Sequence, residues 1–300
     1  MIPARDVAAS VRQRLLNKAR SDHRPFGELL QYFAIERFLY RLSRSEHNER
    51  FILKGALMLQ VWGSSEIRPT MEIDLLGSTH NEEADAVSQV RDILNVDAKE
   101  DGLLFDPTNI RTERITEGAE HEGIRIRFGG TLGTAQVHMQ IDIGFGDVVY
   151  PGPEVAQLPV LLDFPAPRLI GYSRESTVAE KLEAMVKLGM LNSRMKDFYD
   201  IWLLSRQFDF DGAKLTEAVR LTFDRRGTVL SQPVEAFTTS FANVKQVQWS
   251  AFLNRLQQKH VPTSFAEITA ALGEFLSPVV EALVSGSACP KHWKASGPWT

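Results

Sequence analysis

The chain has 300 residues, of which 43% are hydrophobic and 24% charged, a composition typical of a globular protein with room for two packed domains. No apolar run reaches the roughly 18 residues of a membrane span. The charged N-terminus does not resemble a secretory signal, and one cysteine, Cys289, excludes an internal disulfide framework. We therefore expect a cytoplasmic protein without a membrane partner.

The net charge of −4 is unevenly distributed along the chain. Residues 1–54 carry 11 Lys and Arg against 6 Asp and Glu, whereas residues 55–165 carry 7 against 19. A basic segment suits a polyanion such as RNA, and an acidic segment suits divalent cations. Both are equally expected as solvated faces of a mildly acidic protein, so charge alone selects no function.

The first half of the chain alternates between helical and strand patterns. Apolar residues at helical spacing predict a helix over 27–45 and a shorter one over 51–63, which ends at Gly63. A period of two predicts a strand over 70–77, and a helix is expected over 82–94. Three further alternating segments predict strands over 109–117, 123–130 and 136–145.

Proline and glycine in YPGPEV and FPAPRLIG mark a change of pattern, and nearly everything beyond residue 172 is predicted to be helical. The first of these helices is expected to use Ser176 as its N-cap, and the tail 285–300 is expected to be loose. The predicted helices span residues 176–190, 193–208, 212–226, 244–260 and 265–284. The fold class is α+β, with a mixed sheet and flanking helices in residues 1–168 and an all-helical domain in residues 169–300.

Two acidic residues lie two positions apart on the strand predicted at 70–77. Glu72 and Asp74 therefore point to one face of the sheet. Carboxylates at this spacing suit Mg²⁺, or Mn²⁺ in its place. Asp142, on the strand predicted at 136–145, can join them if the two strands pair. Taken alone, such a pair of acids is more often a solvent-facing strand surface.

Other residues in the sequence suit the binding of phosphate groups. Lys54, Gly55 and Ala56 precede a predicted helical turn, where small residues let a phosphate approach backbone N–H groups. The later segment adds a group of charged side chains, which are Lys181, Lys187, Arg194, Lys196, Asp197 and Asp200. Together with the paired acids, these residues describe a site that holds a nucleoside triphosphate through a metal ion.

The segment LKGALMLQVWGSSEIRPTMEIDLLG resembles the signature of the AbiEii/AbiGii family of nucleotidyltransferase toxins, found in type IV toxin–antitoxin and phage-defence systems. The segments AEKLEAMVKLG, NSRMKDFYDIWLL and IDIGFGD are similar to further blocks of that family, and the likeness covers about residues 30–205. The resemblance implies a nucleotidyltransferase-like sheet of the polymerase-β type. It also implies an NTP substrate, Mg²⁺, an RNA acceptor such as tRNA, and a cognate antitoxin as a partner.

The resemblance also implies roles for individual residues. Glu72 and Asp74 occupy the metal-binding positions, and Asp142 is the third carboxylate, which binds metal or accepts a proton. The further matches are Gly55 and Ala56 beneath the triphosphate, Arg68 and Thr70 before the acids, Lys181 at the triphosphate, and Asp200 as a required downstream acid. Lys54, Arg194, Lys196 and Asp197 join the nucleotide-binding set on charge and position.

The chain departs from the family pattern at two positions. Glutamate stands at position 72, where the family has aspartate, and Ala56 stands where the family has a second glycine or serine. The first hypothesis is a Mg²⁺-dependent nucleotidyltransferase toxin that transfers a nucleotide from an NTP to an acceptor such as a tRNA 3′ end. The alternative is a catalytically weakened nucleotide- or RNA-binding protein on the same fold. A metal-dependent nuclease is a third option.

Overall fold

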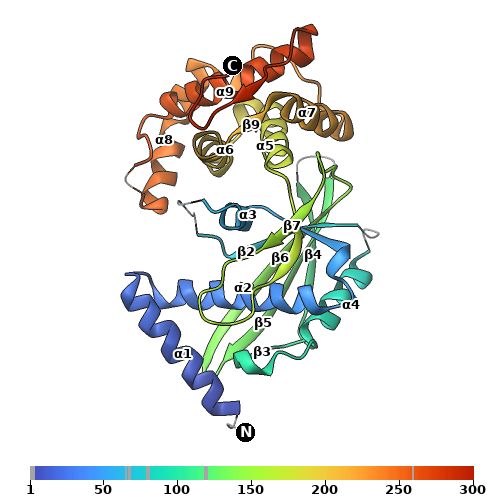
Figure 1. Ribbon diagram of the computed structural model, residues 1–300, viewed down its shortest axis with the longest axis vertical. Helices are drawn as coiled ribbons and strands as arrows, with labels where there is room; N and C mark the ends of the chain where they lie inside the picture. Colours follow the sequence, from blue (N-terminus) through green and yellow to red (C-terminus); the bar gives the residue numbers. More distant parts are fainter. Residues whose placement is uncertain (1–3, 65, 67–68, 79–81, 118–120, 259) are drawn as a thin grey trace. The chain divides into compact units, whose positions relative to one another are not determined.

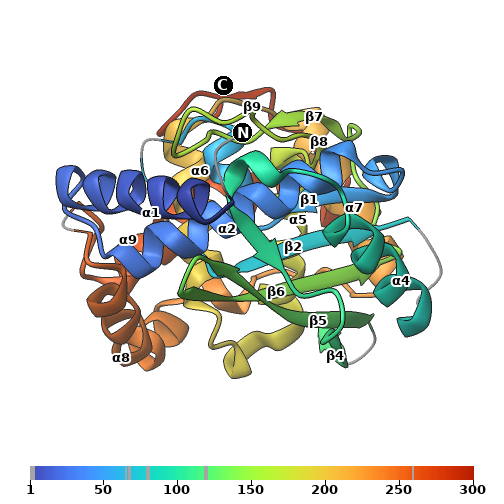
Figure 2. The ribbon, with the colours of Figure 1, turned by 90° about the horizontal axis from the view of Figure 1, so that it is seen from below.

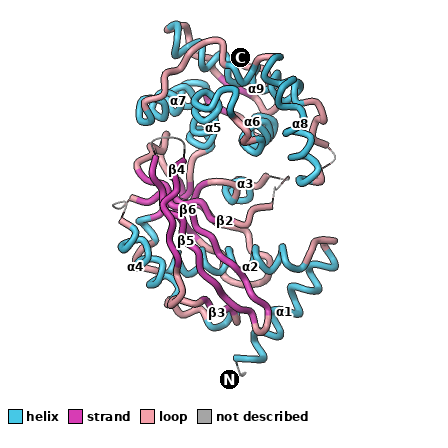
Figure 3. Tube along the Cα trace, turned by 180° about the vertical axis from the view of Figure 1, so that it is seen from behind, coloured by secondary structure: helices cyan, strands magenta, loops and turns pink. Residues whose placement is uncertain are grey.

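The structure, a computed structural model, describes residues 4–64, 66, 69–78, 82–117, 121–258 and 260–300. The chain forms two compact units: unit 1 comprises Met1–Gly146 and Glu154–Gly171, and unit 2 comprises Asp147–Pro153 and Tyr172–Thr300. The long strands belong to unit 1, whereas unit 2 is almost entirely helical (Figure 3). The expected α+β class, a mixed sheet with flanking helices followed by a helical region, is confirmed.

Unit 1 is built on a mixed sheet (Figure 1), to which the described residues contribute eight strands. The strands are β1 (Phe51–Lys54), β2 (Glu72–Gly77), β3 (Leu103–Phe105), β4 (Arg111–Glu117), β5 (His121–Leu132), β6 (Ala135–Phe145), β7 (Glu154–Gln157) and β8 (Arg168–Gly171). Their order is β3-β5-β6-β2-β1-β8-β7, and β4 also pairs with β5. The central strands β2 and β6 run parallel, whereas β5 and β6 form an antiparallel hairpin.

Helices cover one face of this sheet. The helices of unit 1 are α1 (Ala4–Ser21), α2 (Phe26–Arg44), α3 (Leu57–Val61) and α4 (Glu83–Leu94). Of these, α1, α2 and α4 pack against β5 and β6 (Figure 2). Apolar side chains of alternate β6 residues, such as Met139 and Ile141, are buried on the helical side. The intervening residues, including Gln140 and Asp142, therefore point to the opposite face.

Unit 2 is a bundle of helices with a small two-stranded sheet. Its elements are α5 (Arg174–Leu188), α6 (Met195–Gln207), β9 (Phe210–Asp211), α7 (Gly212–Arg226), α8 (Thr239–Leu256), α9 (Phe265–Ser285) and β10 (His292–Trp293). Aromatic rings fill the core: Phe198 stacks on Phe241 with ring centroids 5.7 Å apart, and Phe265 contacts both. Such ring pairs add to the stabilisation that burial already gives.

The long helix α9 is apolar enough to cross a membrane by length and composition. In this structure one side of the helix lies in the core of unit 2, where Phe265, Leu272 and Phe275 are completely buried. A core helix of a globular unit meets the same length and hydropathy criteria. We therefore assign α9 to the core of unit 2.

The helix predicted over residues 51–63 is wrong in its first half. Phe51–Lys54 forms strand β1, which pairs antiparallel with β2 and parallel with β8. Gly55 then adopts a φ of +73°, which ends the strand before the short helix α3 begins at Leu57. Three apolar residues and a lysine before a helix carry no periodicity of their own, so the sequence pattern does not separate the two elements.

Two expectations for unit 2 are also wrong. The N-cap of α5 is Ser173, whose side chain accepts a hydrogen bond from the Ser176 backbone N–H, so Ser176 lies inside the helix. The tail is ordered, because β10 pairs with β9 and the Trp293 indole donates to the backbone oxygen of Ser205 at 2.7 Å. Trp299 stacks on Phe275, so aromatic burial fixes a segment whose composition predicts a loop.

Candidate functional site

The three acids predicted to converge lie together on unit 1. In the parallel register of β2 and β6, Asp74 lies opposite Asp142 and Glu72 lies opposite Gln140. Each of the three acids offers a carboxylate oxygen within 4.8 Å of one from each of the others. The two strands therefore pair, and the three acids lie together as expected for that case.

Neighbouring side chains hold Glu72 at the start of β2. Gln140 donates from Nε2 to Glu72 Oε1 at 2.9 Å. The Thr70 hydroxyl accepts from the Glu72 backbone N–H at 3.3 Å and donates to the Glu72 backbone oxygen at 3.2 Å. Thr70, predicted to bind nucleotide, thus forms a local turn that fixes the backbone of the first acid.

An arginine binds both oxygens of the third acid. Arg125, directly opposite Asp142 in the register of β5 and β6, donates from Nε to Oδ1 at 2.8 Å and from a terminal nitrogen to Oδ2 at 2.6 Å. These hydrogen bonds raise the pKa of Arg125, so its charge is permanent. Asp142 is thereby held in one orientation within a largely buried position.

Gly55 gives Asp74 the space that it occupies. A Cβ at Gly55 would overlap the carboxylate of Asp74, and the positive φ also favours glycine. Lys54, opposite Asp74 in the register of β1 and β2, is almost fully buried. Ala56 is buried at the beginning of α3, which is only five residues long.

The donor set of this cluster fits a divalent metal ion. Octahedral Mg²⁺ with metal–oxygen distances of about 2.0–2.1 Å brings its ligand oxygens to about 3–4 Å from one another. The three carboxylates approach this spacing, because an oxygen of each lies within 4.8 Å of one from each of the others. Carboxylate oxygen is also the ligand type that Mg²⁺ and Mn²⁺ prefer.

A second charged cluster lies in unit 2. Lys181 of α5 donates from Nζ to Asp197 Oδ1 at 2.7 Å and to Asp200 Oδ2 at 2.9 Å. The Arg194 side chain donates to the other oxygen of Asp197 at 2.6 Å. Burial alone would raise the pKa of Asp197, but Lys181 and Arg194 lower it to about 2. The two aspartates, three residues apart on α6, therefore share one cation.

Lys196 is exposed on α6 next to Asp197, and its charge also lowers the pKa of that aspartate. Arg68 lies outside the described residues. Tyr199 and Trp202, further along α6, are buried and contact each other in the helical core.

Sequence reasoning missed several residues that surround the predicted ones. Arg125 and Gln140 become visible only when the strand register is known, because each lies opposite or beside an acid on another strand. In unit 2 it missed Arg226, whose buried guanidinium binds Asp147 at 2.9 Å and Glu183 at 2.9 Å. A charge pattern such as RMKD could have indicated ion pairs, but nothing in the sequence pairs residues 79 positions apart.

Comparison with known proteins places the chain in a family. The family model described as "nucleotidyl transferase AbiEii toxin, type IV TA system" matches residues 37–276. No curated protein matches the chain. Among solved structures, a candidate nucleotidyltransferase from H. pylori is 13% identical with a TM-score of 0.46, over 87% of this chain and 97% of that one. JHP933 from Helicobacter pylori is 12% identical with the same TM-score, over 86% and 94%. Because the family match spans most of its length, the chain belongs to the AbiEii family of nucleotidyltransferase toxins of type IV toxin–antitoxin systems.

Proposed function

We propose that this chain is a metal-dependent nucleotidyltransferase that transfers a nucleotide from an NTP to RNA, with a tRNA 3′ end as the acceptor, in the cytoplasm. Family membership implies a nucleotide substrate and an antitoxin. The observation that carries the proposal is the convergence of Glu72, Asp74 and Asp142 on one face of β2 and β6. This is the donor set that a metal-assisted phosphoryl-type transfer requires.

The residues of the acid cluster would act in distinct ways. Glu72, Asp74 and Asp142 would hold Mg²⁺ or Mn²⁺, which when bound neutralises charge on the triphosphate and the leaving pyrophosphate. Arg125 keeps Asp142 oriented by its two hydrogen bonds. Asp142 then completes the metal site or accepts the proton of the attacking hydroxyl. Gly55 leaves the space in which Asp74 lies.

We assign the remaining charged residues to the nucleotide on the family resemblance. Lys181 would neutralise charge on the triphosphate, and Asp197 and Asp200 would hold its ammonium group in place. Arg194, Lys196, Lys54, Ala56 and Arg68 complete the proposed nucleotide-binding set. The support for Lys181 is that it is a cation on a rigid helix whose position two buried aspartates fix.

The direct test is incubation of the purified protein with each labelled NTP and total RNA, with and without Mg²⁺. We expect label to enter RNA only when Mg²⁺ is present, and Asp74→Asn to abolish the transfer while the protein stays folded. Absence of any transfer by folded wild-type protein would refute the proposal. RNA that becomes shorter rather than longer would indicate a metal-dependent nuclease instead.

The glutamate at position 72 makes a second measurement necessary. If the natural site is catalytically weakened and only binds nucleotide or RNA, Glu72→Asp should create or strongly raise transfer. If glutamate is a working ligand, the substitution should leave transfer unchanged or lower it, and this is the outcome that we expect. Transfer rates of the two proteins at several Mg²⁺ concentrations distinguish these outcomes.

A further inference from the structure

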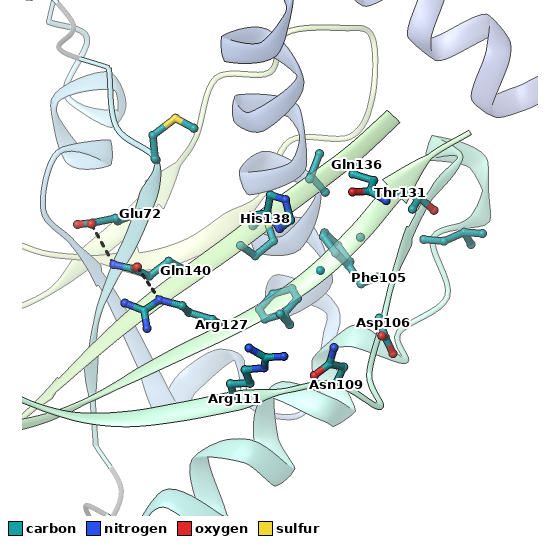
Figure 4. Close-up of a pocket in the computed structure, with 17 residues that line it drawn as sticks. Glu72, Phe105, Asp106, Asn109, Arg111, Arg127, Thr131, Gln136, His138 and Gln140 are labelled. Atoms are coloured by element: carbon teal, nitrogen blue, oxygen red, sulfur yellow. Dashed lines mark hydrogen bonds between the residues drawn. The ribbon is translucent and has the colours of Figure 1, made fainter. Parts of the chain in front are cut away.

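A groove of about 930 Å³ runs over unit 1 beside the acid cluster (Figure 4). It begins at Met71 and Glu72, crosses β6 and β5, and reaches Leu104 of β3 and Asn109 before β4. Its size is within the range of roughly 300–1,000 Å³ that is typical of ligand sites. Glu72 therefore belongs both to the acid cluster and to the near end of this groove.

Strand register explains the shape of the groove. Residues of β5 and β6 that pair on the open face are Arg127 with Gln140, Gly129 with His138, and Thr131 with Gln136. Gly129 leaves the middle of the floor without a side chain: a Cβ there would meet only the backbone oxygen of Val137, at 3.9 Å. A side chain at position 129 would thus fit the strand and fill the groove.

Two arginines line the side of the groove formed by β4 and β5. Arg111 lies opposite Arg127 in the register of these strands, and Arg111 is exposed. Arg127 donates from Nε to Gln140 Oε1 at 3.1 Å, and Gln140 in turn donates to Glu72 (Figure 4). The guanidinium group of Arg127 also binds Glu113 at 2.9 Å, while half of the side chain stays exposed. Both arginines line the groove, and guanidinium groups are good donors to phosphate oxygens.

The same groove offers apolar surface at both ends. Met71 is 54% exposed beside Glu72, and Leu104 is 67% exposed at the far end. Among the described residues that line the groove, the acid at that end is Asp106. It accepts two hydrogen bonds from Thr108 of its own loop, which lower its pKa. Cations beside exposed apolar side chains suit single-stranded nucleic acid, whose phosphates need positive charge and whose unpaired bases bury apolar surface.

We propose that this groove binds the 3′-terminal single strand of the RNA acceptor, with its terminal hydroxyl at the Glu72 end. The inference rests on the proposed function, since a transferase must present that hydroxyl to the metal-bearing acids. The hydrogen-bonded chain Arg127–Gln140–Glu72 joins the phosphate-binding side of the groove to the acid cluster. A peptide segment of an antitoxin would explain the apolar ends, but it would not require two arginines beside a groove that leads to three carboxylates.

Three variants test the groove. Arg111→Glu reverses a charge on its side, and Gly129→Val fills its floor in a strand that tolerates a β-branched residue. Arg168→Glu is the matched control, because Arg168 is an exposed cation on β8, which the sheet order places away from β5 and β6. The probe is a fluorescent single-stranded RNA of about twelve nucleotides, a length suited to such sites. Its affinity is measured by anisotropy at several salt concentrations, and NTP binding is measured separately by equilibrium dialysis.

We expect both groove variants to bind the RNA at least about tenfold more weakly than wild type, and Arg111→Glu to reduce the salt dependence of binding. The control should bind RNA with an affinity within roughly twofold of that of wild type. All three variants should also bind NTP with an affinity within roughly twofold of that of wild type. In transfer assays the KM for RNA should rise more than kcat falls. Circular dichroism melts establish that each variant is folded, and Arg111→Glu, a surface change, carries the test if Gly129→Val does not fold.

Wild-type protein that binds no RNA, or groove variants that bind it as tightly as wild type, would overturn the inference. So would loss of antitoxin binding in these variants with RNA binding unchanged, which would assign the groove to a protein partner. The proposed function can fail independently: a wild type that binds RNA through the groove but transfers no nucleotide refutes the transferase and leaves the groove. Transfer that is equal in wild type and variants refutes the groove and leaves the transferase.

Discussion

Replacing Lys181 by methionine tests whether the ion pairs of unit 2 stabilise the fold. The Lys181 ammonium lies 2.7 Å from Asp197 and 2.9 Å from Asp200, and the Asp197 side chain is fully buried. Methionine retains the apolar stem but removes the charge. Breaking a buried ion pair by removing one partner costs about 3–5 kcal/mol. Because Arg194 still binds Asp197, we expect a loss of about 3 kcal/mol in the free energy of unfolding at pH 7.

The pH dependence of this loss follows from the pKa of Asp197. That pKa is about 2 in the folded protein against an ordinary value of 3.8, so the carboxylate contributes stability that is fully present above about pH 4. This contribution is lost as the pH falls towards 2, where Asp197 becomes protonated. In Lys181→Met, burial raises the pKa of Asp197 and protonation relieves the unpaired charge. The difference in unfolding free energy between wild type and variant should therefore narrow as the pH falls from the raised pKa of the variant towards 2.

Urea unfolding followed by tryptophan fluorescence measures this effect. Four of the five tryptophans belong to unit 2, namely Trp202, Trp249, Trp293 and Trp299. Lys214→Met, which changes an exposed lysine on α7, is the control and should change stability by no more than about 0.5 kcal/mol. If Lys181→Met unfolds at the same urea concentration as this control at pH 7, the ion pairs do not stabilise the fold. Transfer activity is then compared per folded molecule, which separates a role at the triphosphate from a role in folding.

Two further substitutions test the contacts that shape each unit. Gly55→Ala places a Cβ at a φ of +73° and against the Asp74 carboxylate. We therefore expect the free energy of unfolding to fall by about 1–2 kcal/mol and nucleotide transfer to fall at least about 100-fold. Transfer equal to that of wild type would show that Asp74 need not occupy its present position. Trp293→Ala removes the ring packed on Phe275 and the hydrogen bond to Ser205, so urea unfolding should show a loss of about 3–5 kcal/mol in the free energy of unfolding. An unchanged urea midpoint would mean that the tail does not belong to the core.

The fold could be predicted from the sequence where periodicity extends over enough residues. Strand β6 alternates between apolar and polar residues, β2 and β5 do so over residues 72–75 and 124–128, and the helix predicted over 212–226 coincides with α7. Short elements were not predictable in this way: β1, β7 and β8 have four residues each, too few to show a period. The order of the tail is unpredictable for another reason, because Trp293 and Trp299 are fixed by tertiary contacts that composition does not reveal.

For the candidate site, the sequence could supply the acids but not what holds them. Two carboxylates at spacing two must share a strand face, and that local rule identified Glu72 and Asp74. The contacts of Asp142 with Arg125 and of Glu72 with Gln140 depend on which strands pair and in which register. Register is set by the burial of the opposite face over the whole sheet, so a short motif does not reveal it.

The environment of Glu72 explains how a glutamate can replace the aspartate of its family. A glutamate side chain has one more rotatable bond, so a free glutamate would lose more conformational entropy on binding a metal ion. Here Thr70 holds the backbone of Glu72, and Gln140 holds its carboxylate from the strand directly opposite. An aspartate at this position would be too short to keep the bond from Gln140, which itself receives a hydrogen bond from Arg127. The longer side chain is therefore matched to its neighbours, which is the arrangement that the proposal of Glu72 as a working ligand requires.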